Sequence, residues 1–106
     1  MRSLKAVLLF SMPVLLSGAA HAQSCSDVDY RTMKVLEKVF SLPASEISPN
    51  AEFVGRLKIN DEKEDQLVSA LENEFGIKTS QWDEDAEWNK VQDAIVEVRR
   101  ITKCSG

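Results

Sequence analysis

Residues 53–77 read FVGRLKINDEKEDQLVSALENEFGI, and this part of the chain is the most informative about its fold. Apolar residues in its second half recur at i, i+1, i+4 and i+8, which is the spacing of one stripe along an α-helix. They are Leu67, Val68, Leu71 and Phe75. Gly76 suits the left-handed conformation that ends many helices, and Ile77 is a hydrophobic residue in the position that often follows it. The stretch therefore predicts an amphipathic helix that stops at a sharp turn.

The start of this helix has two candidate caps. Asp61 with Glu64 fits a D-x-x-E capping box, and Asn60 is an equally suitable N-cap. A loop precedes the helix and carries Phe53 and Leu57. We expect both side chains to be buried, because a long loop in a small domain needs apolar residues to hold it in place.

Two further long helices flank this one. The first is predicted over residues 27–40 with Ser26 as its N-cap, and the last follows Asn89, which is its candidate cap. Their apolar faces consist of Val28, Met33, Leu36, Val39 and Phe40 in the first helix and Val91, Ala94, Ile95, Val98 and Ile101 in the last. A short third helix is predicted from Gln81 to Ala86. With no alternating strand pattern, the sequence predicts an all-α domain of three longer helices and one short one.

The first 22 residues have the pattern of a secretory signal peptide. Arg2 and Lys5 precede the almost wholly apolar residues 6–16, and residues 20–22 read Ala-His-Ala, which is a cleavage pattern. The alternative is an N-terminal membrane anchor, but the apolar run is too short to span a bilayer. We therefore expect cleavage after residue 22, a mature domain of residues 23–106 in the periplasm or secreted, and no stable membrane span.

Charge narrows the class of partner. The chain carries a formal charge of −4, and cleavage would remove two cations and no carboxylate, leaving 11 Lys and Arg against 17 Asp and Glu, or −6. Such a balance argues against nucleic acid and anionic membrane surfaces as partners and favours basic protein surfaces.

Two cysteines, Cys25 and Cys104, lie at the two ends of the mature domain. In an oxidising compartment such a pair is expected to form one disulfide; the alternative is two thiols that each pair with another chain. The residues before Cys25 fit a lipoprotein-processing site poorly. A metal site is not expected, because two thiols are too few ligands and His21 leaves with the signal peptide.

Catalysis is not expected from the mature chain. It has no histidine and, once oxidised, no free thiol, so Ser/His and Cys/His arrangements are impossible. The carboxylate pairs Asp61 with Asp65 and Asp83 with Asp85 are better explained as caps or solvated faces than as acid–base dyads. The acidic residues 83–87 do not have the spacing of an EF-hand calcium loop.

Taken in order, residues 35–98 resemble an acyl carrier protein. The residues that carry the resemblance are Phe53-Val54, Leu57, Leu67-Val68, Ala70-Leu71-Glu72, Glu74-Phe75-Gly76-Ile77 and Val91-Gln92-Asp93-Ala94-Ile95. The resemblance implies a small four-helix bundle of acyl carrier type. It also implies that the start of the first helix lies beside the end of the last, where Cys25 and Cys104 would meet.

The sequence departs from the family at the centre of this resemblance. The serine that carries the phosphopantetheine arm in the family falls on Asp61, and its flanking residues fall on Asn60 and Glu62. A carboxylate cannot form the phosphodiester that joins the arm, and neither Ser48 nor Ser69 is in register to replace it. We therefore expect the fold without the carrier chemistry and without a cofactor.

The resemblance also suggests where partners bind. In the family, the surface of helices two and three meets partner enzymes, and a comparable patch here would consist of Asp61, Glu62, Asp65, Glu72 and Trp82, interrupted by Arg56, Lys58 and Lys63. Trp82 and Trp88 have two possible roles. Both could be core residues, or at least one of them could be an exposed anchor for a binding partner.

The leading hypothesis is an exported, non-catalytic protein-binding module, such as an adaptor, inhibitor or immunity-type protein. The alternative is a non-covalent binder of fatty acyl or other lipid chains, with Met33 and Leu36 yielding to the guest. A third possibility is a true carrier or an enzyme.

Overall fold

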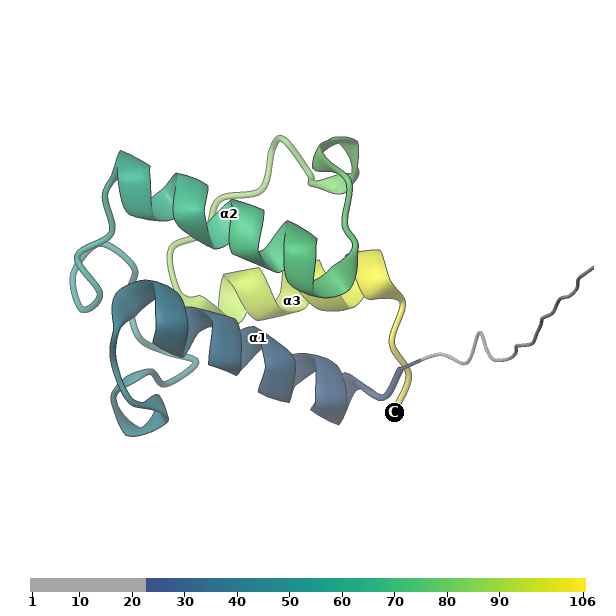
Figure 1. Cartoon of the computed structure of the whole chain (residues 1–106), viewed down its shortest axis with the longest axis horizontal. Coiled ribbons are helices and arrows are strands. Elements are labelled where there is room, and N and C mark those ends of the chain that lie inside the picture. The colour runs from purple at the N-terminus through teal and green to yellow at the C-terminus, as the bar shows by residue number, and fades with distance from the viewer. Residues whose placement is uncertain (1–22) are drawn as a thin grey trace, which may run out of the picture.

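The computed structural model of the chain describes residues 23–106, and the predicted signal peptide lies outside this described part (Figure 1). The three α-helices are α1 (Cys25–Phe40), α2 (Asp61–Phe75) and α3 (Val91–Thr102). Two short 3₁₀ turns are η1 (Ala44–Glu46) and η2 (Thr79–Gln81). The described residues contain no strand, so the all-α prediction is confirmed for them.

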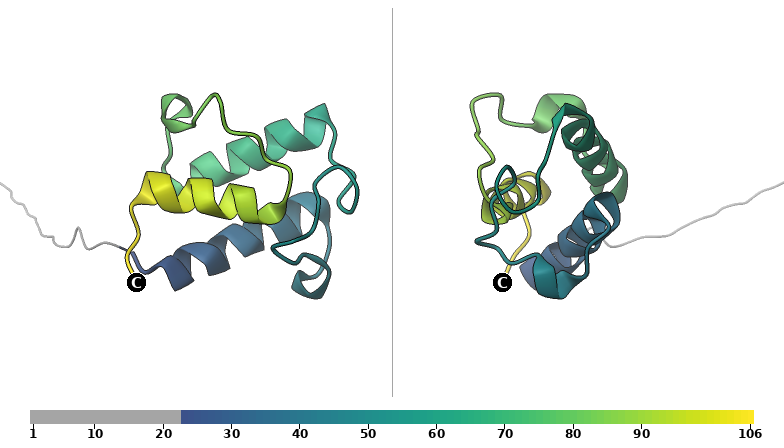
Figure 2. Two further views of the ribbon diagram at one scale, coloured as in Figure 1. Left: turned by 180° about the vertical axis from the view of Figure 1, so that it is seen from behind. Right: turned by 90° about the vertical axis from the view of Figure 1, so that its left-hand side faces the viewer.

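The three helices enclose one core. α1 and α2 lie side by side and run in opposite directions, whereas α3 runs in the same direction as α2 (Figure 1). α3 lies against one face of the α1–α2 pair, as the view from behind and the view from the side both show (Figure 2). No helix between residues 23 and 106 is long and apolar enough to cross a bilayer.

The predicted apolar faces build this core. Leu67 and Leu71 of α2 are fully buried, and the loop residues Phe53 and Leu57 are buried beside them as expected. Val68 and Phe75, which share the α2 stripe, are only partly buried at its edges. The remaining buried apolar residues are Val28, Val35, Leu36, Val39, Ile47, Ile77, Val91, Ala94, Ile95 and Val98. The 3.6-residue spacing of the apolar side chains therefore identified most of the core.

Both ends of α2 can be explained from single residues. Asn60 is the N-cap, with its Oδ1 accepting a hydrogen bond from the backbone N–H of Lys63 at 2.8 Å. The alternative capping box is wrong, because Asp61 is the first residue of the helix and not its cap. At the other end Gly76 adopts φ 66°, where a side chain would be strained, and the buried Ile77 donates its N–H to the carbonyl of Glu72.

The caps of the other two helices differ from the predicted ones. α1 begins earlier than expected, because Ser24 and not Ser26 accepts a hydrogen bond from the N–H three residues on. α3 is capped from inside: the Asp93 carboxylate accepts from the N–H groups of Asn89 and Lys90, at 2.9 and 3.0 Å. The Asn89 side chain is therefore not the cap.

The short third helix predicted from Gln81 to Ala86 is wrong, and the count of four helices is not confirmed. The turn η2 ends at Gln81, and the backbone of Trp82 is extended, with φ −70° and ψ 143°. The Trp82 indole N–H donates to Glu72, and the backbone N–H of Asp83 donates to Glu97. These bonds to α2 and α3 use groups that a helix would orient differently. Three successive carboxylates at the C-terminal end of such a short helix would also oppose its dipole.

The two ends of the domain meet, as the family resemblance implied. The N–H of Cys25 donates to the carbonyl of Ser105, and the N–H of Ser105 donates to the carbonyl of Gln23, at 2.9 and 3.0 Å. The Cα atoms of Cys25 and Cys104 are 5.0 Å apart, within the range that a disulfide requires.

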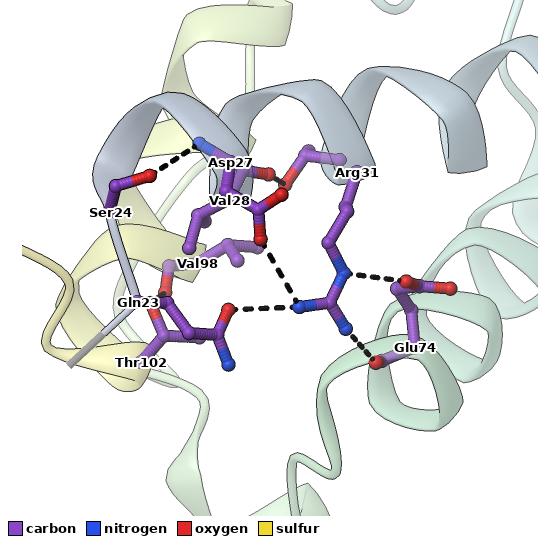
Figure 3. A network of polar contacts seen from close by, with 9 residues as sticks. Gln23, Ser24, Asp27, Val28, Arg31, Glu74, Val98 and Thr102 are labelled. Carbon is purple, nitrogen blue, oxygen red and sulfur yellow. Dashed lines mark hydrogen bonds and ion pairs between the residues drawn. The ribbon is translucent and has the colours of Figure 1, made fainter. Parts of the chain in front are cut away.

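Arg31 joins three parts of the chain near these ends (Figure 3). Its Nε donates to the Glu74 carboxylate and its Nη2 to the Glu74 carbonyl, both at 2.7 Å, at the end of α2. Its Nη1 donates to the side chain of Gln23 at 2.9 Å. The guanidinium also lies over the ring of Phe75, 4.6 Å from its centroid. One side chain of α1 thus holds the N-terminal segment and the last turn of α2 together.

Candidate functional site

Four carboxylates line the first two turns of α2, and we call them the acidic strip. The strip consists of Asp61, Glu62, Glu64 and Asp65, all of which are exposed. Carboxylates are favoured there because the helix dipole places partial positive charge at its N-terminus. Within residues 23–106 none of the four forms an ion pair. Lys63, which interrupts the strip in sequence, instead donates to the carbonyl of Val39 at 2.9 Å. The strip therefore presents uncompensated negative charge.

The predicted partner-binding residues fall into two groups. Asp61, Glu62 and Asp65 belong to the acidic strip, whereas Glu72 lies seven residues beyond Asp65, or about 10 Å further along the helix axis. Glu72 accepts hydrogen bonds from the Trp82 indole at 2.9 Å and from the hydroxyl of Thr79 at 3.1 Å. Glu72 and Trp82 therefore form the second group, in which the Glu72 carboxylate fixes the orientation of the Trp82 indole.

A pocket of about 410 Å³ opens beside the acidic strip, and we call it the aromatic pocket. It lies between α2, the loop before α2 and residues 82–88. Its apolar lining consists of Phe53, Val54, Ile59, Val68, Trp82, Ala86 and Trp88. Trp82 and Trp88 meet edge to face with ring centroids 5.5 Å apart, and Trp88 stacks on Phe53 at 6.4 Å. Both tryptophans are half-buried, so each belongs partly to the core and partly to the pocket wall.

The polar lining of the aromatic pocket is entirely acidic. It consists of Glu64, Asp83, Glu84 and Glu97. Glu97 is buried, at 6% exposed, and accepts from Arg100 Nη2 and from the Asp83 N–H, both at 2.7 Å. The hydrogen bond from Arg100 lowers the pKa of Glu97 most strongly; the Asp83 N–H and the charge of Arg100 lower it further, against the opposing effect of burial. Glu97 is therefore a fixed anion at neutral pH.

Sequence patterns did not identify Glu97 or the pocket. A signal for Glu97 exists: it lies at the edge of the apolar α3 stripe, beside Ala94 and Ile101, and Arg100 follows three residues later. The pocket has no comparable signal, because residues 53–59 and 82–88 are irregular segments whose packing depends on long-range contacts. Within residues 23–106 no group of three or more potential ligands is placed to hold a metal ion.

Glu97→Gln is expected to lower the free energy of unfolding at pH 7 by about 1–2 kcal/mol, because a charged hydrogen bond to a buried group is lost. Since the folded-state pKa of Glu97 is lowered, its contribution is present above the usual value of 4.5 and is lost as the pH falls through the lower folded-state pKa. Urea denaturation of variant and wild type from pH 7 to pH 3 measures this difference. The exposed Glu87→Gln is the control. A difference that grows on acidification would contradict the assignment.

Asn60→Ala is expected to cost about 1 kcal/mol of stability, because it removes the side-chain acceptor for the Lys63 N–H. Asp61→Ala is expected to cost only about 0.5 kcal/mol, because Asp61 contributes through the helix dipole alone. Urea denaturation of the two variants distinguishes the cap from its neighbour. A larger cost for Asp61→Ala would show that Asp61 has a structural role beyond its place in the first turn.

Comparison with known proteins gives a clear relative. The acyl carrier protein of Solidesulfovibrio magneticus is 41% identical to this chain over an alignment of 71 residues, and the match covers 59% of the chain and 88% of that protein. No family model matches the chain. The likeness therefore spans nearly the whole of that relative and leaves part of this chain outside it.

Proposed function

This chain belongs to the acyl carrier protein family, and from that premise we propose that it is an exported, non-catalytic protein-binding module without a prosthetic group. In this role it acts as an adaptor, an inhibitor or an immunity-type protein. Its scaffold is that of a carrier, and its recognition surface is the acidic strip together with the neighbouring loop. The observation that carries the proposal is the exposed, unpaired carboxylate of Asp61 at the first position of α2.

The residues at this position do not fit the prosthetic group of the family. A carrier needs a hydroxyl at the start of α2 to form a phosphodiester, and Asp61 offers a carboxylate in its place. The first hydroxyl within α2 is that of Ser69, eight residues on and therefore about 12 Å along the axis. We infer that the carrier chemistry has been lost and that the surface around the site has been retained for recognition.

The negative charge of the acidic strip favours a partner protein with a basic surface. Its four carboxylates lie on consecutive turns of one helix and keep their charge free for an intermolecular contact. Complementary charge accelerates association and rejects partners of the wrong sign. The aromatic pocket, which Glu64 borders, adds apolar contact area to this charged surface. We then expect contacts in the aromatic pocket to provide most of the affinity for the partner, and the charges of the acidic strip to set the partner's orientation.

Export and a disulfide are further parts of the proposal. The sequence pattern of residues 1–22 and the 5.0 Å separation of the Cys25 and Cys104 Cα atoms support them independently. A bond there would hold together the first residue of α1 and the segment after α3, which the backbone hydrogen bonds of Ser105 already join.

Non-covalent binding of a lipid chain is the second candidate, and the apolar lining of the aromatic pocket favours it. The guest would enter beside Val68 and Trp88, since Leu36 is completely buried in the helix core. The acidic lining disfavours a fatty acid, whose own carboxylate would be repelled. This candidate therefore requires a neutral or cationic head group.

The first experiment is intact mass spectrometry of protein from a periplasmic extract, measured native and denatured. We expect a denatured mass equal to residues 23–106 less two hydrogens, with no covalent adduct. A covalent arm would overturn the proposal in favour of a true carrier. A ligand present only in the native spectrum would favour the lipid candidate.

The second experiment is capture of a partner on immobilised wild type, followed by binding measurements with purified variants. Glu62→Lys and Asp65→Lys are expected to weaken binding by about tenfold each, because like charges then face each other. Glu87→Lys makes the same charge change outside the strip and is the control. Equal binding by all variants would contradict recognition through the strip.

A further inference from the structure

We infer that the aromatic pocket receives one arginine side chain of the partner protein, an inference that rests on the proposed protein-binding function. The pocket is thereby the anchor point of the interface, next to the acidic strip. An interface of this kind commonly has a small number of buried anchors, and arginine is among the residue types most often found there.

The walls of the pocket suit a planar organic cation. Trp82 and Trp88 meet at an interplanar angle of 76°, so their rings form two sides of a corner, and Phe53 continues the aromatic surface behind Trp88. Aromatic faces attract cations through their quadrupole, tryptophan most strongly. The volume of about 410 Å³ lies near the lower end for small-ligand sites, which suits one long side chain.

The charges at the pocket have one sign and come from two sides. Glu64 projects from α2, whereas Asp83 and Glu84 belong to the segment opposite. No lysine or arginine lines the pocket, and within residues 23–106 none pairs with these three carboxylates. A guanidinium between the two sides would meet carboxylates on both, and its planar array of donors matches carboxylate geometry better than an ammonium does.

The inner wall of the pocket already contains a contact between a carboxylate and a guanidinium of the same chain. Glu97 is held by Arg100, which donates from Nε and Nη2 at 3.1 and 2.7 Å, and by the Asp83 N–H. Arg100 also donates to the carbonyl of Gln81, so its guanidinium is engaged by Glu97 and Gln81, and its charge also acts on Asp83. Glu97 is therefore satisfied. Asp83 Oδ1 accepts from the Asp85 N–H at 2.9 Å, so Glu64, Glu84 and the second carboxylate oxygen of Asp83 remain for the incoming cation.

The inference predicts a selectivity that a lipid site would not have. A fatty acid places a carboxylate among acidic side chains, whereas arginine places a cation there. A neutral side chain of the same shape would fill the pocket but would leave the carboxylates unpaired. The ranking expected for the pocket is therefore arginine first, its neutral isostere second and a fatty acid last.

Intrinsic fluorescence provides a direct measurement, because Trp82 and Trp88 are the two tryptophans of the chain and both line the pocket. The probes are acetyl-Leu-Arg-Leu-amide, the same peptide with citrulline in place of arginine, and decanoate. We expect saturable binding of the arginine peptide at millimolar concentration or below and binding of the citrulline peptide about tenfold weaker. Decanoate is expected not to change the spectrum. Equal binding of the two peptides, tighter binding of decanoate, or no peptide binding would overturn the inference.

Matched variants locate the peptide. Glu64→Gln, Asp83→Asn and Glu84→Gln are each expected to weaken the arginine peptide about threefold, and together about thirtyfold, with little effect on the citrulline peptide. Glu87→Gln, in the same segment but outside the lining, is expected to leave both unchanged. Far-ultraviolet circular dichroism shows whether each variant is folded, and a folded triple variant with wild-type affinity would overturn the inference.

The same variants separate this inference from the proposed function. A purified partner that is released by Glu62→Lys but keeps its affinity for Asp83→Asn and Glu84→Gln would leave the protein-binding function standing and remove the arginine anchor. Selective binding of the arginine peptide without any protein partner would show the pocket specificity and contradict the proposed function.

Discussion

Replacing Cys25 and Cys104 by serine is expected to lower the free energy of unfolding by about 4 kcal/mol relative to the oxidised protein. The two residues are 79 positions apart, so the bond removes much of the conformational freedom of the unfolded chain. The folded state needs little distortion to form it, because the flanking backbone is already joined by the Cys25 and Ser105 hydrogen bonds. A domain of this size has only a few kcal/mol of stability to lose.

Urea denaturation with and without a thiol reductant measures this contribution. The reduced wild type and the Cys25→Ser, Cys104→Ser double variant are expected to have the same midpoint, well below that of the oxidised protein. A midpoint that does not respond to reductant would show that the bond is absent or contributes nothing. In that case the two thiols would be open to pairing with other chains.

Phe53→Ala is expected to lower the free energy of unfolding by about 3–4 kcal/mol. The Phe53 ring is 1% exposed and packs against Phe40 on α1 and Trp88 in the segment before α3, with centroids 6.2 and 6.4 Å away. Its backbone N–H and carbonyl bond to Asn89 and Ile59. The side chain therefore connects α1, the loop before α2 and the segment before α3, and its loss leaves a cavity that these irregular segments cannot easily fill.

Chemical denaturation gives the stability, and the fluorescence of the tryptophans reports on the pocket wall. Val54→Ala is the control, because Val54 is adjacent in sequence and 76% exposed, and its loss is expected to change stability by less than about 0.5 kcal/mol. Similar effects of the two substitutions would show that the loop is not held by Phe53. A red-shifted emission in Phe53→Ala is expected as Trp88 becomes more exposed.

The helices were predictable from sequence to different degrees. Long apolar stripes identified α2 and α3 correctly, because burial of Leu67, Leu71, Ala94 and Val98 outweighs any local preference. The caps were less predictable, since neighbouring serines such as Ser24 and Ser26 have the same intrinsic capping ability. The prediction of a short third helix failed because Trp82 and Asp83 form hydrogen bonds with residues 10 and 14 positions away in the chain. A local sequence pattern contains no information about such contacts.

The candidate site was likewise predictable from sequence only in part. Three residues of the acidic strip, Asp61, Glu62 and Asp65, were predicted from their place at a helix start and from the family resemblance, whereas Glu64 was assigned to a capping box. The aromatic pocket could not be predicted, because its walls come from two irregular segments and two helices, α2 and α3. Trp82 and Trp88 were recognised as unusual residues, yet only their contact at 5.5 Å and the shared neighbour Phe53 show that they form one surface.

Because residues 23 and 105 are joined by a backbone hydrogen bond, the helices could be connected in a different order along the chain without moving them in space. With both ends at one place, a short peptide between Gly106 and Gln23 would close the domain into a ring. New ends could then be cut in the exposed turn at residues 54–56, leaving all three α-helices whole. The part of the chain from residue 23 to residue 106 is thus a suitable subject for circular permutation, and a reporter fused at either of these two residues would emerge from the same side.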